Sequence, residues 1–142
     1  MAADLSRFLK AQERDYAQAL REIQSGHKRS HWMWYIFPQI QGLGFSSTAQ
    51  FYAIENLQEA KDYLAHPVLG ARLKEISSAL LQLDGLTASE IFGYPDDLKL
   101  RSSMTLFRLA DLDCEIFQAV LDKYYDGEAD NKTIRIVQEL SR

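Results

Sequence analysis

The chain has 142 residues, of which 46% are hydrophobic and 25% are charged, and its formal net charge at pH 7 is −4. These values predict one folded globular domain over residues 1–142 and exclude an intrinsically disordered chain. The negative net charge also excludes a general nucleic-acid-binding protein, although residues 27–31 form a local basic segment.

The first predicted element is an amphipathic helix that ends at Gly26. Its apolar residues recur at helical spacing, and they are Leu5, Phe8, Leu9, Tyr16, Leu20 and Ile23. Glycine is common directly after a helix because it adopts a left-handed backbone conformation without steric cost. The segment HKRSHWMWYIFPQIQGLGFSS, residues 27–47, follows, and Pro38 within it predicts that any helix there ends near Phe37.

Two longer helices are predicted between Asn56 and Gly85. Asn56 with Glu59 three residues later resembles a capping box, in which side chains and backbone bond reciprocally at a helix N-terminus. Pro67 stands at the start of the second helix, and Gly85 follows its end. Ahead of both helices, FSSTAQFYAI is the only segment whose pattern allows a short strand.

Two further helices are predicted from Thr87 onward. Thr87 and Glu90 give a second capping-box pattern over ASEIF, which Gly93 follows. Pro95 then begins PDDLKLRSSMTLFRLAD, and the two aspartates behind it suit the positive end of the helix dipole. Both segments are therefore expected to start at well-defined positions.

Two helices complete the prediction. Asp113 is expected to cap CEIFQAVLDKYY, which Gly127 terminates, and Asp130 or Asn131 is expected to cap a final helix. In DGEADNKT, Asp130 and Thr133 are interpreted as structural, with a place on the rim of a pocket only if the final helix packs near the aromatic segment. Together the patterns predict a compact all-α domain of about seven helices.

Cysteine content and hydropathy indicate the compartment. Cys114 is the only cysteine, which excludes an internal disulfide and a multi-cysteine metal site and fits a reducing compartment. The N-terminal residues lack the apolar core of a signal peptide, and no segment approaches the roughly 18 apolar residues that span a bilayer. We therefore expect a cytoplasmic protein with no membrane partner, no metal and no cofactor.

Four segments in order resemble the domain of unknown function 1810 family of bacterial and fungal proteins. They are HWMWYIFPQIQGLG, HPVLGARL, FGYPDDLKLRSSMTLF and LDKYYDGEADNKTI, and the resemblance covers nearly the whole chain. It implies an all-helical fold and no established reaction. Members often carry the label calpastatin, but a calpain inhibitor of that kind is polar and disordered until it binds. This chain is rich in aromatic residues and capped helices, so we set the label aside.

Residues 27–47 are the first candidate for a wall of a binding site. Basic groups beside flat aromatic side chains suit an anionic ligand with a ring, such as a nucleotide derivative, and glycines allow close backbone approach. The candidate ligand-binding residues here are Lys28, Arg29, His31, Trp32, Trp34, Gln39, Gly42 and Gly44. The alternative is that the aromatic residues belong to the core and bond to the backbone through their polar tips.

The helix that begins at Pro95 is the second candidate wall. Asp96, Lys99 and Ser103 lie three and four residues apart and so share a helical face. Serines in the middle of a helix have poor propensity, which makes this run unusual. The candidate catalytic residues are Asp96, Asp97, Lys99 and Ser103, and Ser102 is a candidate ligand-binding residue. The alternative is a solvated surface ion pair of little energetic weight.

Two other chemistries fit the sequence less well. Lys99 and Ser103 are spaced like a Ser–Lys nucleophile pair, but no oxyanion-hole motif accompanies them. His27 and His31 have the spacing of metal ligands on a helix, but Gly26 places His27 in a turn.

The leading hypothesis is a small-molecule pocket between residues 31–39 and the first half of the Pro95 helix. In its most concrete form, the protein hydrolyses an N-glycosidic bond in a nucleotide-derived metabolite. Trp32 or Trp34 would stack on a ring of that ligand. The cations assigned to phosphate are Lys28, Arg29 and Lys99, and the carboxylates assigned to water are Asp96 and Asp97.

Two hypotheses from other classes remain open. One is an adaptor without catalysis that binds another protein through an exposed aromatic patch at residues 32–37. The other gives these residues a purely structural role. The adaptor predicts a flat, contiguous and exposed apolar patch, whereas the pocket predicts a concavity lined by both candidate walls.

Overall fold

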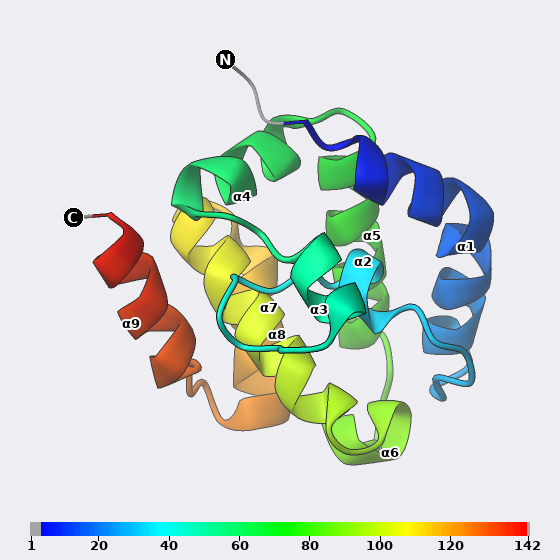
Figure 1. Cartoon of the computed structure of the whole chain (residues 1–142). Helices are drawn as coiled ribbons and strands as arrows, with labels where there is room; N and C mark the ends of the chain where they lie inside the picture. The colour runs from blue at the N-terminus through cyan, green and yellow to red at the C-terminus, as the bar shows by residue number, and fades with distance from the viewer. Residues whose placement is uncertain (1–3, 142) are drawn as a thin grey trace.

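The computed structural model describes residues 4–141, and nine helices make up this part of the chain (Figure 1). They are α1 (Ser6–Gln24), α2 (Met33–Ile36), α3 (Ser47–Tyr52), α4 (Leu57–Ala65), α5 (Leu69–Leu81), α6 (Ala88–Phe92), α7 (Asp96–Ala110), α8 (Glu115–Tyr125) and α9 (Asn131–Leu140). The all-α prediction is confirmed, and the helices beyond the expected number include the short α2 and α3. No helix within residues 4–141 is long and apolar enough to cross a membrane.

The core is organised around α7. This helix packs against α4, α6, α8 and α9, while α5 packs against α1, α4 and α8. Leu100, Met104 and Phe107 on α7 are completely buried, at a spacing of three or four residues that keeps them on one helical face. In Figure 1, α1 and α9 lie on opposite sides of the molecule, with α7 and α8 between them.

The segment FSSTAQFYAI forms a helix rather than the short strand that its pattern allowed. Ser46 caps α3 by accepting a hydrogen bond from the Ala49 N–H at 3.1 Å. The β-type pairing within residues 4–141 is limited to one isolated bridge between Ile40 and Ile54. The bridge joins a residue before α3 to a residue after it, so it closes the segment between them, which contains α3, into a loop.

Two predicted helix starts are confirmed. Thr87 and Glu90 form the complete capping box at the start of α6. Asp130 caps α9 through its carboxylate, which accepts a hydrogen bond from the Thr133 N–H at 3.1 Å. Both caps are formed by residues three positions apart in sequence, which is why local patterns predict them.

Two other predicted caps are wrong in detail. Asn56 accepts a hydrogen bond from the Glu59 N–H, but the Glu59 carboxylate does not bond back to it. That carboxylate instead accepts a hydrogen bond from the Glu55 N–H at 3.0 Å and forms an ion pair with Arg7 of α1 at 2.9 Å. The bond back to the Asn56 N–H that would complete the box is therefore replaced by these two contacts. At α8 the cap is Cys114, without a side-chain hydrogen bond, and not Asp113.

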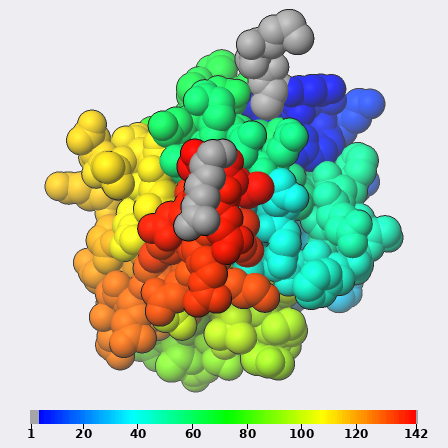
Figure 2. Space-filling view, turned by 60° about the vertical axis from the view of Figure 1, so that its left-hand side comes forward, coloured from blue at the N-terminus to red at the C-terminus, as the bar shows by residue number. Residues whose placement is uncertain are grey.

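The last helix packs near the aromatic segment. In Figure 2, α9 lies in front, between the region of α7 on one side and the residues that lead into α3 on the other. Gly42 has a positive φ of 93°, and a Cβ at this position would meet the Ile136 side chain of α9 at 3.4 Å. Glycine therefore allows the segment after Gln39 to turn tightly against α9.

Candidate ligand-binding cleft

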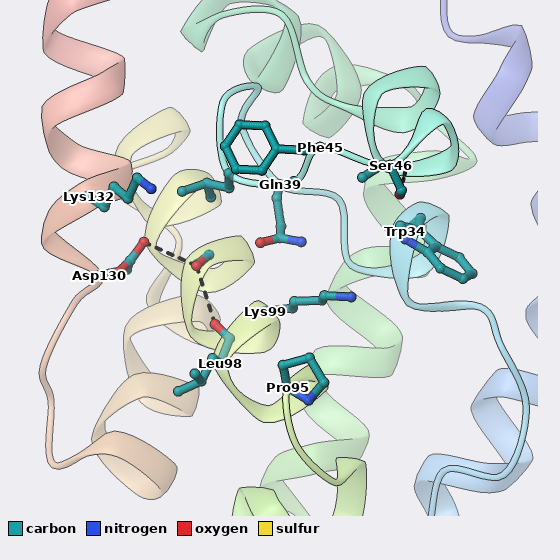
Figure 3. A pocket seen from close by; sticks show the side chains of 13 residues that line it. Trp34, Gln39, Phe45, Ser46, Pro95, Leu98, Lys99, Asp130 and Lys132 are labelled. Atoms are coloured by element: carbon teal, nitrogen blue, oxygen red, sulfur yellow. Dashed lines mark hydrogen bonds between the residues drawn. The ribbon is translucent and has the colours of Figure 1, made fainter.

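A cleft of about 480 Å³ opens between α7, the start of α9 and the segment that joins α2 to α3 (Figure 3). Its lining residues are Trp34, Gln39, Leu43, Gly44, Phe45, Ser46, Ala49, Pro95, Leu98, Lys99, Ser102, Asp130 and Lys132. A volume of this size is typical of small-molecule sites. Six of the thirteen lining residues are polar or charged, and the other seven are apolar or glycine.

Gln39 projects into the cleft from a fixed backbone. Its carbonyl accepts a hydrogen bond from the Ile54 N–H at 2.8 Å, which holds the main chain in place. Its side-chain amide points into the hollow in Figure 3 and has no hydrogen-bond partner within residues 4–141. An amide offers both donors and an acceptor, so this side chain is available to a ligand from either type of group.

Two lysines reach the cleft from different helices. The Lys99 ammonium lies 5.7 Å from the centroid of the Trp34 ring and 3.4 Å from a carboxylate oxygen of Asp96. Lys132 lies in the first turn of α9, across the cleft from Trp34 in Figure 3, and forms no ion pair within the described residues. Both ammonium groups remain partly or fully in contact with solvent, where an anion can reach them.

Asp130 joins α9 to α7 at the edge of the cleft. One oxygen of its carboxylate accepts hydrogen bonds from the Thr133 N–H at 3.1 Å, the Thr133 hydroxyl at 2.5 Å and the Ser102 hydroxyl at 3.1 Å. The Thr105 hydroxyl accepts a hydrogen bond from the Asp130 N–H at 2.9 Å. The polar residues in the middle of α7 are therefore explained in large part by their role in docking α9.

A row of charges links the cleft to the loop after α1. Asp96 forms ion pairs with Lys28 at 2.9 Å through one oxygen and with Lys99 at 3.4 Å through the other. The Lys28 side chain is only 7% exposed, and its ammonium also donates to the Ser30 carbonyl at 2.6 Å. Asp96 thus positions Lys99, while Lys28 is occupied within the protein.

A second polar cluster is centred on Glu22 and is called the Glu22 hub. It comprises Glu22 and the four residues that donate hydrogen bonds to its carboxylate, which are Gln18, Arg29, Ser30 and Trp32. The Glu22 carboxylate accepts hydrogen bonds from the Arg29 N–H at 2.7 Å, the Ser30 N–H at 2.9 Å and the Ser30 hydroxyl at 2.6 Å. It also accepts from the Trp32 indole at 2.9 Å and the Gln18 amide at 3.1 Å. Burial alone would raise the pKa of Glu22, but these hydrogen bonds outweigh it and lower the pKa to about 2.

Both candidate walls contribute residues to the same cleft. The predicted site residues among its lining are Trp34, Gln39, Gly44, Lys99 and Ser102. Gly44 is needed for the shape, because a Cβ there would come within 2.6 Å of the Ala49 Cβ. The segment after Gln39 can therefore lie close to α3 only with glycine at this position.

Several predicted residues of the first wall lie elsewhere. Trp32 is 1% exposed, so its ring has no face to offer a ligand, and the stacking role expected of it is corrected on that ground. The Lys28 ammonium is paired with Asp96, and Gly42 lies at the turn that packs against α9. Arg29 bonds to Glu22 through its backbone N–H, and its exposed side chain lies outside the cleft. His31 lines a separate hollow on the other side of Trp34.

On α7, Asp97 and Ser103 do not join the cleft. Ser103 is completely buried and its hydroxyl has no hydrogen-bond partner within the described residues, so neither water nor a ligand reaches it. The Asp97 carboxylate accepts a hydrogen bond from the Leu98 N–H at 2.9 Å and is absent from the cleft lining. Asp96 acts on the cleft only through Lys99.

The exposed aromatic patch of the adaptor hypothesis is not present at residues 32–37. Trp32 and Phe37 are buried, with 1% and 0% exposure, and only Trp34 is half-buried. A flat docking surface cannot be built from side chains that lie in the core.

Sequence reasoning did not single out several of the cleft residues. Among them, Leu43, Phe45 and Ser46 come from the loop before α3, and Lys132 comes from α9. Phe45 is 78% exposed at the mouth of the cleft, which is unusual for so large an apolar side chain. A phenylalanine directly after GLG is a local signal for a loop that faces solvent, whereas Lys132 could be placed only by knowing how α9 packs.

Comparisons with known proteins give a family and a fold. The family described as "Protein of unknown function (DUF1810)" matches residues 2–137. A crystal structure of a conserved hypothetical protein from Mycobacterium tuberculosis shares 47% sequence identity with this chain, with a TM-score of 0.93. The match covers 95% of this chain and 96% of that one. No curated protein matches the sequence.

Proposed function

We propose that this chain, which belongs to the DUF1810 family of unknown function, binds an anionic small molecule in the cleft. The ligand carries a ring and is of the nucleotide-derivative class. One observation carries the proposal. Gln39, Lys99 and Lys132 reach a single hollow from three separate segments, with an amide and two ammonium groups available to a ligand. Convergence of polar groups on an otherwise apolar cleft is the usual mark of a binding site.

The arrangement suits both parts of such a ligand. Trp34 supplies a flat aromatic surface for a ring, and Lys99 stands beside that surface at 5.7 Å from the ring centroid. The contact between Lys99 and Asp96 is long, at 3.4 Å, and partly exposed, so a phosphate or carboxylate competes with it at little cost. The Gln39 amide points into the cleft and can form hydrogen bonds with polar atoms on the edge of the ligand's ring.

Charge in the cleft favours an anion. Among the lining side chains, Lys99 and Lys132 against Asp130 leave a net charge of +1, from two lysines minus one aspartate. The chain as a whole carries −4. A local positive region on a negative protein attracts small anions to this position rather than to the surface at large.

We extend the proposal to hydrolysis of an N-glycosidic bond, with Asp130 as the base. A water oxygen would bond to the anomeric carbon as the carbon–nitrogen bond breaks, and the electron pair would leave with the nitrogen base. Asp130 would accept the proton from water and pass it to that leaving group. Asp130 replaces Asp96 and Asp97 in this role because it lines the cleft, whereas both oxygens of Asp96 already pair with lysines.

Calorimetry with AMP, ADP, adenosine and inorganic phosphate tests the binding proposal. We expect AMP and ADP to bind at up to millimolar concentration, and adenosine or phosphate alone to bind more weakly. Lys99→Gln should weaken AMP binding about tenfold, since it removes a charge-assisted hydrogen bond. Lys61→Gln, at an exposed lysine outside the cleft, is the matched control and should change nothing. Absence of binding by all four compounds would falsify the proposal.

The hydrolytic step has its own test. Asp130→Asn keeps a good helix cap, so the variant should fold and still bind AMP. Release of free adenine from AMP, followed by liquid chromatography, should fall at least a hundredfold in this variant. If Asp130→Asn releases adenine as fast as the unmodified protein, or if the unmodified protein releases none, the binding proposal stands without the reaction.

A further inference from the structure

Trp34 separates the cleft from a second hollow of about 550 Å³. The second hollow lies between α1, the His31 loop and α3, and its distinctive lining residues are Arg14, His31, Ser47, Thr48, Phe51 and Tyr52. Trp34 lines both cavities. A half-buried tryptophan with a hollow on each side is therefore the partition between them.

The second hollow offers one cationic donor, Arg14, whose side chain is paired with its neighbour Asp15 and is 69% exposed. The Arg14 guanidinium bonds to the Asp15 carboxylate through Nε at 3.1 Å and through Nη2 at 3.0 Å. Asp15 also accepts a hydrogen bond from the Tyr35 hydroxyl, and burial followed by that contact raises the pKa of Tyr35 to about 12. The two bonds to Asp15 use Nε and Nη2, and the Arg14 side chain is largely exposed, so the guanidinium can also donate to an anion from solvent.

Aromatic surface accompanies these donors. Phe51 is 59% exposed, and its ring stands edge-on to Tyr52 at a centroid distance of 4.9 Å. The hydroxyl groups of Ser47 and Thr48 have no hydrogen-bond partner within residues 4–141. The second hollow thus repeats the chemistry of the cleft, which is a ring surface beside cationic and neutral donors.

The two cavities meet around Trp34. A constriction of about 20 Å³, lined in part by Trp34, Gln39 and Tyr52, lies between them, and its volume admits about one water molecule. Trp34 is the residue that the two hollows share. There Ser46 belongs to the cleft and its neighbour Ser47 to the second hollow, so the path along the surface is short.

We infer that the two cavities are halves of one site for a two-headed ligand, in which two ring-bearing halves are joined by a phosphate linkage, as in dinucleotides. The inference rests on the proposed function, because the cleft must bind one half. Each hollow supplies a ring surface and at least one cation, and the phosphate linkage of the ligand would cross the edge of Trp34. Joining two halves that bind separately raises affinity because the second contact becomes intramolecular.

Calorimetry with AMP and with diadenosine diphosphate tests the inference. We expect diadenosine diphosphate to bind at least about tenfold more tightly than AMP. The double variant Arg14→Gln, His31→Gln should lose that advantage while AMP affinity stays within about twofold, since the cleft is unchanged. Arg21→Gln, at an exposed arginine of the same helix, is the matched control and should keep the full advantage.

The outcomes separate the two proposals. If AMP binds but diadenosine diphosphate binds no more tightly, the two-headed site is overturned and the cleft proposal survives. If diadenosine diphosphate still binds more tightly than AMP in the double variant, the two-headed site is overturned as well. If neither compound binds the unmodified protein, the proposed function fails and this inference fails with it.

Discussion

Trp32 and Trp34 lie two residues apart, yet they belong to opposite kinds of environment. The Trp32 indole donates to Glu22 at 2.9 Å and its ring is 1% exposed. Trp34 is half-buried and its indole has no hydrogen-bond partner within the described residues. The same contrast holds for the lysines beside them, since Lys28 is enclosed against Asp96 and Lys99 stands at the edge of the cleft.

This contrast shows what distinguishes structural from functional residues of one type. Around the Glu22 hub, polar groups find partners inside the protein, and the cost of burying them is offset. Around Trp34, an amide, an indole and an ammonium group are positioned by the fold and left available. Residue type alone does not separate the two regions, whereas hydrogen-bond satisfaction does.

The largest effect is expected from removing the charge at the centre of the hub. Glu22→Gln should lower the free energy of unfolding by about 3 kcal/mol, because several donors lose a charged acceptor in a buried site. Urea denaturation followed by circular dichroism measures this. Glu13→Gln, at an exposed position of α1, should change it by less than about 0.5 kcal/mol. Equal effects at the two positions would remove the basis of the comparison.

The same carboxylate predicts a pH dependence. The pKa of Glu22 is lowered from 4.5 to about 2 on folding, so its ionised form stabilises the protein fully above about pH 4.5. This contribution is lost as the pH falls from about 4.5 toward 2, and Glu22→Gln lacks it. The difference between the two proteins in urea denaturation should therefore shrink across that range. A difference that stays constant down to about pH 2.5 contradicts the assignment.

Matched substitutions of the tryptophans sharpen the comparison directly. Trp32→Phe should lower the free energy of unfolding by about 2 kcal/mol, because it leaves a small cavity and removes one hydrogen-bond donor to Glu22. Trp34→Phe should change the free energy of unfolding by less than about 0.5 kcal/mol while weakening AMP binding several-fold. Denaturation and calorimetry on the same two variants give both quantities. A larger stability loss for Trp34→Phe would reverse the roles that we assign.

The smallest effects are expected at the lysines. Lys28→Met should lower the free energy of unfolding by about 1.5 kcal/mol, since it leaves Oδ2 of Asp96 without its ion-pair partner. Lys99→Met should cost less than about 0.5 kcal/mol, because the ion pair it breaks is long and partly exposed. Thermal denaturation resolves the difference. If both variants lose the same stability, Lys99 belongs to the structural set and not to the cleft.

Much of the fold could be predicted from the sequence because its signals are local. The Thr87–Glu90 capping box and the Asp130 cap depend on residues three positions apart, and the structure contains both. The short helix α3 could not be predicted, since six residues are too few to show a helical period. The capping box at Asn56 is incomplete because the Glu59 carboxylate bonds to the Glu55 N–H and to the distant Arg7 instead of to the Asn56 N–H.

The cleft could be predicted only as two segments, not as a set of side chains. Trp34, Gln39 and Lys99 line it, but Trp32 and Ser103 from the same segments are buried. Which side chains face a hollow depends on how three helices pack, and sequence periodicity does not specify the direction of a short helix such as α2. Asp130 and Lys132 enter through the docking of α9, which is a purely tertiary event.

The position of α9 has a consequence for biosynthesis. Trp34 and Gln39 are synthesised before α4 to α8, whereas Asp130 and Lys132 follow α8. A nascent polypeptide that has reached α8 already contains the Glu22 hub and every helix that packs around α5, yet it lacks the side of the cleft that α9 supplies. The cleft is therefore complete only once α9 has been made and docks on α7.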